Sequence, residues 1–97
     1  MAIERYRYVF CDEVPIEDIE ASLLLAIFAT ESLHGESQVR LDVSHFLDTD
    51  RRVCVIDSGT AVGQDLNRLF VGFMRREFGE DSFRVERVDV PAAPVAA

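Results

Sequence analysis

The alternation of hydrophobic and polar positions along the chain predicts four strands. Residues 5–11 (RYRYVFC) alternate with the period of two that is typical of a half-buried strand, and residues 39–46 alternate again. A polar turn at 48–50 leads into a further strand at 52–56, so these two segments are expected to form a hairpin. The last predicted strand covers residues 82–90.

Two longer stretches repeat their apolar residues at helical spacing. The first opens at Pro15, carries carboxylates in its first turn, where they suit the helix dipole, and stops at Gly35. The second is capped by Thr60 and ends at Gly79. The predicted order is therefore strand, helix, strand, strand, helix, strand.

This order is that of an α+β domain with the ferredoxin-like, split βαβ arrangement (βαββαβ), in which both helices cover one face of a four-stranded antiparallel sheet. Right-handed crossovers place the first and third strands in the middle. A chain of 97 residues with 48% apolar content suits one modest core, so residues 1–90 are expected to form a single domain. Residues 91–97 lack periodicity and bulk, and we expect them to be disordered.

The charge balance restricts the partners that this chain is expected to have. Ten basic against eighteen acidic residues give a net charge of −8, which opposes binding to nucleic acids and anionic membranes. All ten basic residues are arginine. The absence of lysine excludes Schiff-base enzymes, Ser-Lys dyads and the usual phosphate-loop ATPases. Without a signal-peptide pattern or a long apolar run, the expected location is the cytoplasm.

The cysteines and histidines indicate neither a metal site nor a cofactor. Cys11 and Cys54 are too far apart for a zinc motif, and each lies in apolar, strand-like sequence, so both are expected to be buried in the core. Antiparallel pairing of the first and third strands would bring the two thiols close together. His34 and His45 have no ligand or catalytic partner at a diagnostic spacing. We therefore expect no enzymatic activity.

The first predicted helix carries apolar residues on two sides. One stripe suits packing on a sheet, and it consists of Ile16, Ile19, Leu23, Ala26, Ile27 and Thr30. Ala21, Leu24, Leu25 and Phe28 cluster on nearly the opposite side, where a helix resting on a sheet is normally polar. This second patch predicts an interface, either with a second copy of the chain or with a partner protein, unless the C-terminal tail or a loop covers it.

The open face of the predicted sheet is rich in arginine. If Tyr6, Tyr8 and Phe10 face the helices together with Val39, Leu41, Val43, Phe83 and Val85, the opposite face carries Arg5, Arg7, Arg40, Asp42, Ser44, Arg84 and Glu86. Guanidinium groups match carboxylates and phosphates, so one interpretation is a binding surface for small anions. The alternative, which we favour, is a solvated face of cross-strand ion pairs.

Residues 55–60 (VIDSGT) resemble the active-site signature of aspartic peptidases. By that resemblance Asp57 would be the catalytic carboxylate, and a homodimer would supply the second aspartate. The match covers six residues, and the predicted helix that follows at once departs from the almost wholly β fold of those enzymes. We favour a strand-to-helix turn in which Asp57 bonds to backbone amides and Thr60 caps the helix. Gly59, Thr60 and Gly63 would then let a small anion approach the helix N-terminus.

Gly72 is the remaining anomaly, because glycine inside a helix costs about 0.5–1 kcal/mol relative to alanine. It suggests a close approach by another backbone, although it need not have been selected for one. Together the patterns predict a small interaction module that self-associates through the outer face of its first helix. The alternatives are a binder of small anions or acidic ligands and, more distantly, an acid hydrolase centred on Asp57.

Overall fold

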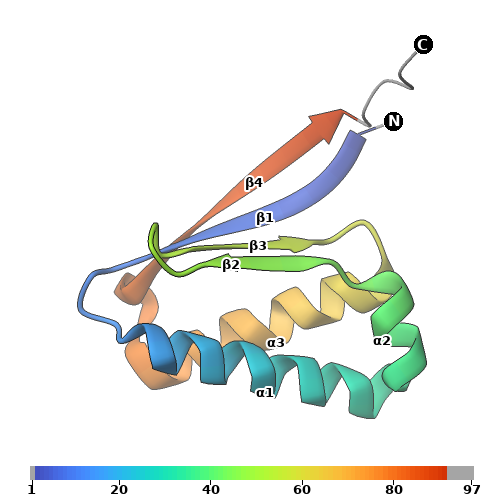
Figure 1. Cartoon of the computed structure of the whole chain (residues 1–97), viewed down its shortest axis with the longest axis horizontal. Helices are drawn as coiled ribbons and strands as arrows, with labels where there is room; N and C mark the ends of the chain where they lie inside the picture. The colour runs from blue at the N-terminus through green and yellow to red at the C-terminus, as the bar shows by residue number, and fades with distance from the viewer. Residues whose placement is uncertain (1, 92–97) are drawn as a thin grey trace.

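The computed structural model describes residues 2–91, with side chains from Glu4 to Val88. These residues form a mixed α+β fold with a four-stranded antiparallel sheet and three α-helices (Figure 1). The strands are β1 (Ala2–Phe10), β2 (His45–Asp48), β3 (Val53–Asp57) and β4 (Phe83–Pro91). The helices are α1 (Ile16–His34), α2 (Glu36–Asp42) and α3 (Ala61–Phe78), and a 3₁₀ turn, η1 (Glu80–Ser82), precedes β4.

The strands of the sheet differ in length. Their order is β2-β3-β1-β4, so the first and third strands are central, as predicted. β1 pairs with β4 from Ala2↔Pro91 to Phe10↔Phe83, whereas its pairing with β3 covers only residues 5–9. The β1–β4 pair therefore continues beyond the shorter strands as a two-stranded ribbon, and all three helices lie below the sheet in Figure 1.

The strand predicted at 39–46 is wrong over most of its length, because α2 occupies part of that segment. Residues 36–42 are helical, and only His45–Asp48 form a strand. Val39 is buried but belongs to α2, and Leu41 is exposed there and does not face the sheet. An i,i+4 ion pair between Arg40 and Glu36, at 2.6 Å, supports the helical conformation. The alternation of residues 39–44 is typical of a strand, and it was misleading because Leu41 is an apolar residue on the exposed side of a helix.

The predicted helix boundaries are confirmed. Gly35 and Gly79 follow α1 and α3 with φ angles of 90° and 88°, a region that side-chain-bearing residues rarely adopt, and each amide bonds back to the preceding turn. Pro15 directly precedes α1, and the Thr60 hydroxyl accepts the Gly63 amide proton at 3.0 Å as the cap of α3. Local residue chemistry alone determines these ends.

The core lies between the sheet and the two long helices. Tyr8 and Phe10 of β1 contact Phe70 of α3 edge to face, with ring centroids 5.1 and 6.1 Å apart. The other buried side chains of this cluster come from the segment before α1, from α1, from β3 and from α3, and they are Val14, Ile19, Leu23, Ala26, Cys54, Ile56, Leu66 and Met74. The predicted assignment of Tyr8 and Phe10 to the helix-covered face is thus confirmed.

Cys11 corrects a second prediction. Its side chain is exposed beyond the end of β1, and its thiol donates to the Asp81 carbonyl at 3.2 Å, so only Cys54 is buried in the core. Cys54 lies opposite Tyr8 in the β1–β3 register. Neither Cys11 nor Cys54 forms a disulfide. The predicted disordered tail at 91–97 lies, apart from Pro91 in β4, outside the described residues.

Candidate functional site

The outer face of α1 carries large apolar side chains that no other described residue covers. Leu24, Leu25 and Phe28 are 50%, 58% and 52% exposed, and Ala21 is exposed beside them. The buried side of the same helix consists of Ile19, Ser22, Leu23, Ala26 and Thr30. At about 100° per residue, the exposed patch is centred almost directly opposite this buried side. The predicted second apolar face is therefore present and open, and we call it the α1 patch.

A groove between α1 and α3 continues the α1 patch. Ala21 and Leu25 line it from α1, and Phe73 and Phe78 line it from α3, around a hollow of about 490 Å³. Asp18 and Arg76 stand at the groove as well. Within the described part of the chain, the Arg76 guanidinium forms no ion pair or hydrogen bond. The groove thus combines aromatic walls with charged side chains of both signs, namely Arg76 against Asp18 and Glu77.

Two of the arginines predicted to bind an anion are already paired with a carboxylate. Arg7 contacts Glu86 across the β1–β4 pair at 3.3 Å, and Arg84 contacts the same carboxylate along β4 at 3.1 Å, as expected of a solvated face. Arg40 is not on the sheet at all, because it lies in α2. Arg5 stands opposite Asp57 in the β1–β3 register, at a small hollow of about 260 Å³ that Phe46 also lines.

The turn from β3 into α3 has the geometry predicted from its residues. The Asp57 carboxylate accepts the Gly59 amide proton at 2.7 Å, and Thr60 caps the Gly63 amide. A Cβ atom on Gly63 would clash with the carbonyl oxygen of Asp57, so this glycine is required for close packing of α3 on β3. The amides of both glycines are thus engaged within the turn, and neither is left free for an anion.

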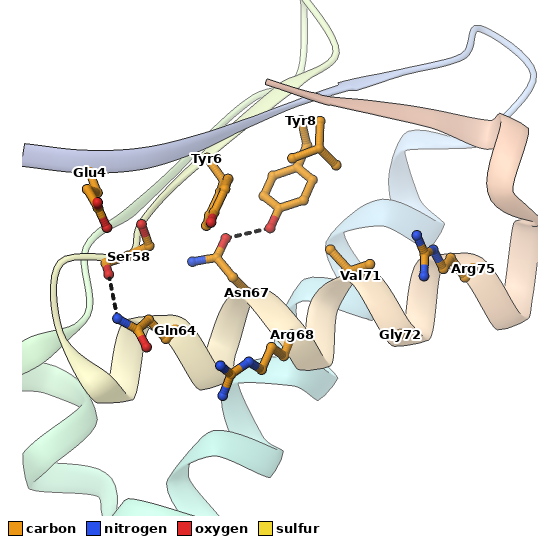
Figure 2. A pocket seen from close by; sticks show the side chains of 11 residues that line it. Glu4, Tyr6, Tyr8, Ser58, Gln64, Asn67, Arg68, Val71, Gly72 and Arg75 are labelled. Carbon is orange, nitrogen blue, oxygen red and sulfur yellow. Dashed lines mark hydrogen bonds between the residues drawn. The ribbon is translucent and has the colours of Figure 1, made fainter. Parts of the chain in front are cut away.

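A cavity between β1 and α3 was not predicted from the sequence (Figure 2). It measures about 470 Å³, in the range of small-molecule sites. Its lining comes from β1 (Glu4, Tyr6, Tyr8), the β3–α3 turn (Ser58), α3 (Gln64, Asn67, Arg68, Val71, Gly72, Arg75) and β4 (Val85). Two signals in the sequence bear on it, namely the tyrosines at alternate positions of β1, which share one face of the strand, and the glycine inside α3.

One end of this cavity is fixed by a buried hydrogen bond. The Tyr8 hydroxyl donates to the Asn67 amide oxygen at 2.5 Å, and the Asn67 nitrogen donates to the Gly63 carbonyl at 2.8 Å. Figure 2 shows the two side chains pointing toward each other from β1 and α3. Burial, followed by the proximity of Cys54 and Tyr6, raises the pKa of Tyr8 well above its ordinary value, so Tyr8 stays a neutral donor.

Comparisons with known proteins provide no assignment for these sites. A scan against protein-family profiles, a search of curated proteins and a search of solved structures each gave no significant match. Among the described residues, no cluster of three or more His, Cys, Asp or Glu side chains is arranged to hold a metal ion. None of the helices in the described range is long and apolar enough to cross a membrane. The geometry of the chain itself is therefore the basis for inferring a function.

Proposed function

We propose that this chain is a self-associating interaction module that forms a homodimer through the α1 patch. The observation that carries the proposal is the exposure of Leu24, Leu25 and Phe28 on the side of α1 opposite the core. A domain of 11.0 kDa has little apolar surface to spare, and contiguous exposed patches of this kind commonly mark interaction sites. Closed two-fold dimers are the commonest assemblies of soluble chains.

The spacing within the α1 patch suits antiparallel pairing of two α1 helices. If a two-fold axis passes between Leu24 and Leu25, each leucine opposes the other leucine of the second copy, and Phe28 opposes Ala21. On both sides of the axis the large Phe28 side chain then meets the small Ala21 side chain, as in knobs-into-holes packing. Phe28 would enter the groove that Ala21, Leu25 and Phe73 line.

The charges around the α1 patch fit the same register. Asp18 would oppose Glu31 of the second copy, which alone would be repulsive. Arg76 lies in the same groove as Asp18 and has no ion-pair partner within residues 2–91, so it is placed to offset part of this repulsion. The proposed interface therefore has an apolar centre and charged ends, which is the usual anatomy of a stable interface.

The finer fold assignment belongs to the same proposal. We infer a ferredoxin-like βαββαβ domain in which α2 is an addition between α1 and β2. The strand order β2-β3-β1-β4 and the antiparallel pairing of every neighbouring pair support this assignment. In such a domain one face of the helix layer points away from the sheet, which is where the α1 patch lies.

Solution mass tests the homodimer. Light scattering at high micromolar concentration should give twice 11.0 kDa for the unchanged chain and 11.0 kDa for Leu25→Glu. Removing a leucine from each half of the interface should weaken the dimer by more than about 100-fold, since each buried leucine is worth about 1.5–3 kcal/mol. Leu33→Glu is the matched control, because Leu33 is 67% exposed on α1 but lies away from the α1 patch.

A size exchange tests the register. Ala21→Phe alone should weaken the dimer, because two large side chains would meet at each end of the patch. Combining Ala21→Phe with Phe28→Ala restores the pairing of large with small in exchanged positions and should recover the mass of the dimer. A monomeric unchanged chain refutes the homodimer, whereas a dimer that survives Leu25→Glu places the interface elsewhere.

A further inference from the structure

We propose that the cavity between β1 and α3 is a binding site for a small, elongated organic carboxylate with a flat apolar body. The site lies on the β1-facing side of α3, which is separate from the groove that the dimer would use. Its polar groups are placed on an apolar floor, which is the usual composition of a small-molecule site. Three independent features of the lining support a ligand.

The first feature is a hydroxyl group that is open to the cavity and has no partner. Ser58 is only 2% exposed, it lines the cavity, and its hydroxyl forms no hydrogen bond with any residue between 2 and 91. The hydroxyl oxygen is not sealed from solvent, because the one fully buried side-chain nitrogen or oxygen atom without a partner in this range is Arg52 Nε. The backbone of Ser58 is fully engaged, since its amide donates to the Glu4 carbonyl and its carbonyl accepts from the Gln64 side-chain amide at 3.4 Å. The hydroxyl alone is left for a ligand.

The second feature is an arginine without a counter-ion. Arg75 lines the cavity, and in the described part of the chain its guanidinium forms no ion pair or hydrogen bond. Figure 2 shows Arg75 reaching up from α3 toward β1, whereas Arg68 turns the other way. Arg68 contacts Asp65 at 3.4 Å, and Glu4 pairs with Arg87, so Arg75 is the unneutralised charge of the lining. A guanidinium in this state selects a carboxylate or a similar anion.

The third feature is the missing side chain of Gly72. A Cβ atom at this position would meet nothing within 4 Å, so the glycine does not serve the backbone approach that the sequence suggested. The room it leaves belongs to the floor of the cavity, next to Val71 and opposite the β1 tyrosines. An open, apolar floor one helical turn from Arg75 suits a flat group attached to the carboxylate, and the Tyr6 ring offers it a stacking partner.

The length of the site defines the ligand further. Gln64 and Arg75 are eleven residues apart on α3, which corresponds to about 16 Å along the helix axis. A ligand that reaches from Arg75 to Ser58 therefore carries its carboxylate at one end and a hydrogen-bonding group at the other. Such a molecule would bind the Ser58 hydroxyl and the Arg75 guanidinium together.

A set of three related probes tests the site. The probes are 3-(4-hydroxyphenyl)propionate, its neutral amide, and 3-phenylpropionate, which lacks the hydroxyl group. Amide ¹H–¹⁵N spectra of the full chain should show saturable shifts at Ser58, Gly72 and Arg75, with the hydroxylated acid bound most tightly. Loss of a charged hydrogen bond should weaken binding of the amide by about tenfold or more.

Variants locate the two polar ends. Arg75→Gln should remove the preference for the acid over the amide, and Ser58→Ala should remove the preference for the hydroxylated acid. Gly72→Leu should block all three probes while the chain stays folded, because its side chain would enter open space. Arg51→Gln, the same charge change in the β2–β3 turn, is the matched control and should bind as the unchanged chain does.

Two results would overturn the proposal. One is the absence of saturable shifts at the cavity residues for all three probes at millimolar concentration. The other is binding that Arg75→Gln and Gly72→Leu leave unchanged, which would place the probes elsewhere on the molecule. Neither result depends on the oligomeric state, because Leu25→Glu supplies a monomeric background in which the same titrations can be repeated.

Discussion

The same substitution, glycine to alanine, is expected to have opposite effects at two positions of α3. At Gly72 nothing lies within 4 Å of the added methyl group, and alanine is about 0.8–1.0 kcal/mol better than glycine inside a helix. Gly72→Ala should therefore stabilise the fold by about 0.5–1 kcal/mol. For a domain of this size, that corresponds to a melting temperature raised by roughly 2–8 °C.

At Gly63 the helical gain is outweighed by a collision with the backbone. The added methyl group would overlap the Asp57 carbonyl oxygen and would lie 3.1 Å from the Thr60 hydroxyl. Separating α3 from β3 to relieve this contact costs about 1–3 kcal/mol of overpacking, and disturbing the Thr60 cap costs about 1 kcal/mol more. After the helical gain of about 1 kcal/mol, Gly63→Ala should destabilise the fold by about 1–3 kcal/mol.

Urea unfolding followed by circular dichroism measures both changes. The midpoint should rise by roughly 0.2–1 M for Gly72→Ala and fall by roughly 0.3–3 M for Gly63→Ala, for the slopes typical of small proteins. Both variants and the unchanged chain must be compared at one protein concentration, since a dimer gains stability by mass action. Midpoints that move in the same direction, or an unchanged midpoint for Gly63→Ala, would refute the packing argument.

Two further predictions concern buried polar groups. Burial raises the pKa of Cys54 from 9.0 to about 12. Between these values the unfolded thiol has lost its proton and the folded one has not, so stability should fall by up to about 1.4 kcal/mol per pH unit as the pH rises above 9. Between pH 9 and 10, the urea midpoint should fall with rising pH in Cys11→Ala, which keeps the buried thiol, but not in Cys54→Ala, which lacks it. Equal pH dependence of the two midpoints would contradict the raised pKa of Cys54. The Arg52 guanidinium donates to the carbonyls of Cys11 and Val14, so Arg52→Ala should lower the free energy of unfolding, measured in urea, by about 1.5–3 kcal/mol. Arg51 is exposed, and Arg51→Ala should lower it little. Similar losses for the two variants would contradict this role of Arg52.

Local chemistry made the ends of the long helices and the β3–α3 turn predictable. Gly35 and Gly79 stop their helices because they can adopt positive φ, and Thr60 caps α3 because its hydroxyl reaches an amide three residues on. These interactions involve only neighbouring residues, so the sequence contains all of the information. The exposure of the α1 patch was predictable for a related reason, since helical periodicity alone separates the two apolar sides of α1.

The segment after Gly35 was not predictable in the same way. Residues 39–44 alternate in polarity as a strand does, although they include the end of a short helix. The choice depends on burial of Val39 against other elements, and on the Arg40–Glu36 ion pair that only a helix forms. The predicted burial of Cys11 was wrong for a related reason. Cys11 lies one residue past the end of β1, where the alternation of a strand no longer determines which side chains are buried.

The cavity between β1 and α3 shows where sequence reasoning stops in physical terms. Gly63 and Gly72 both interrupt an apolar helix, and the sequence assigns each the same cost. What differs is the surroundings of each glycine: the carbonyl oxygen of Asp57, at the end of β3, lies against Gly63, whereas a methyl group on Gly72 would meet no atom within 4 Å. That difference follows from how α3 packs on the sheet, which is a property of the whole fold. The glycine that fills no structural role is therefore the one that points to a ligand.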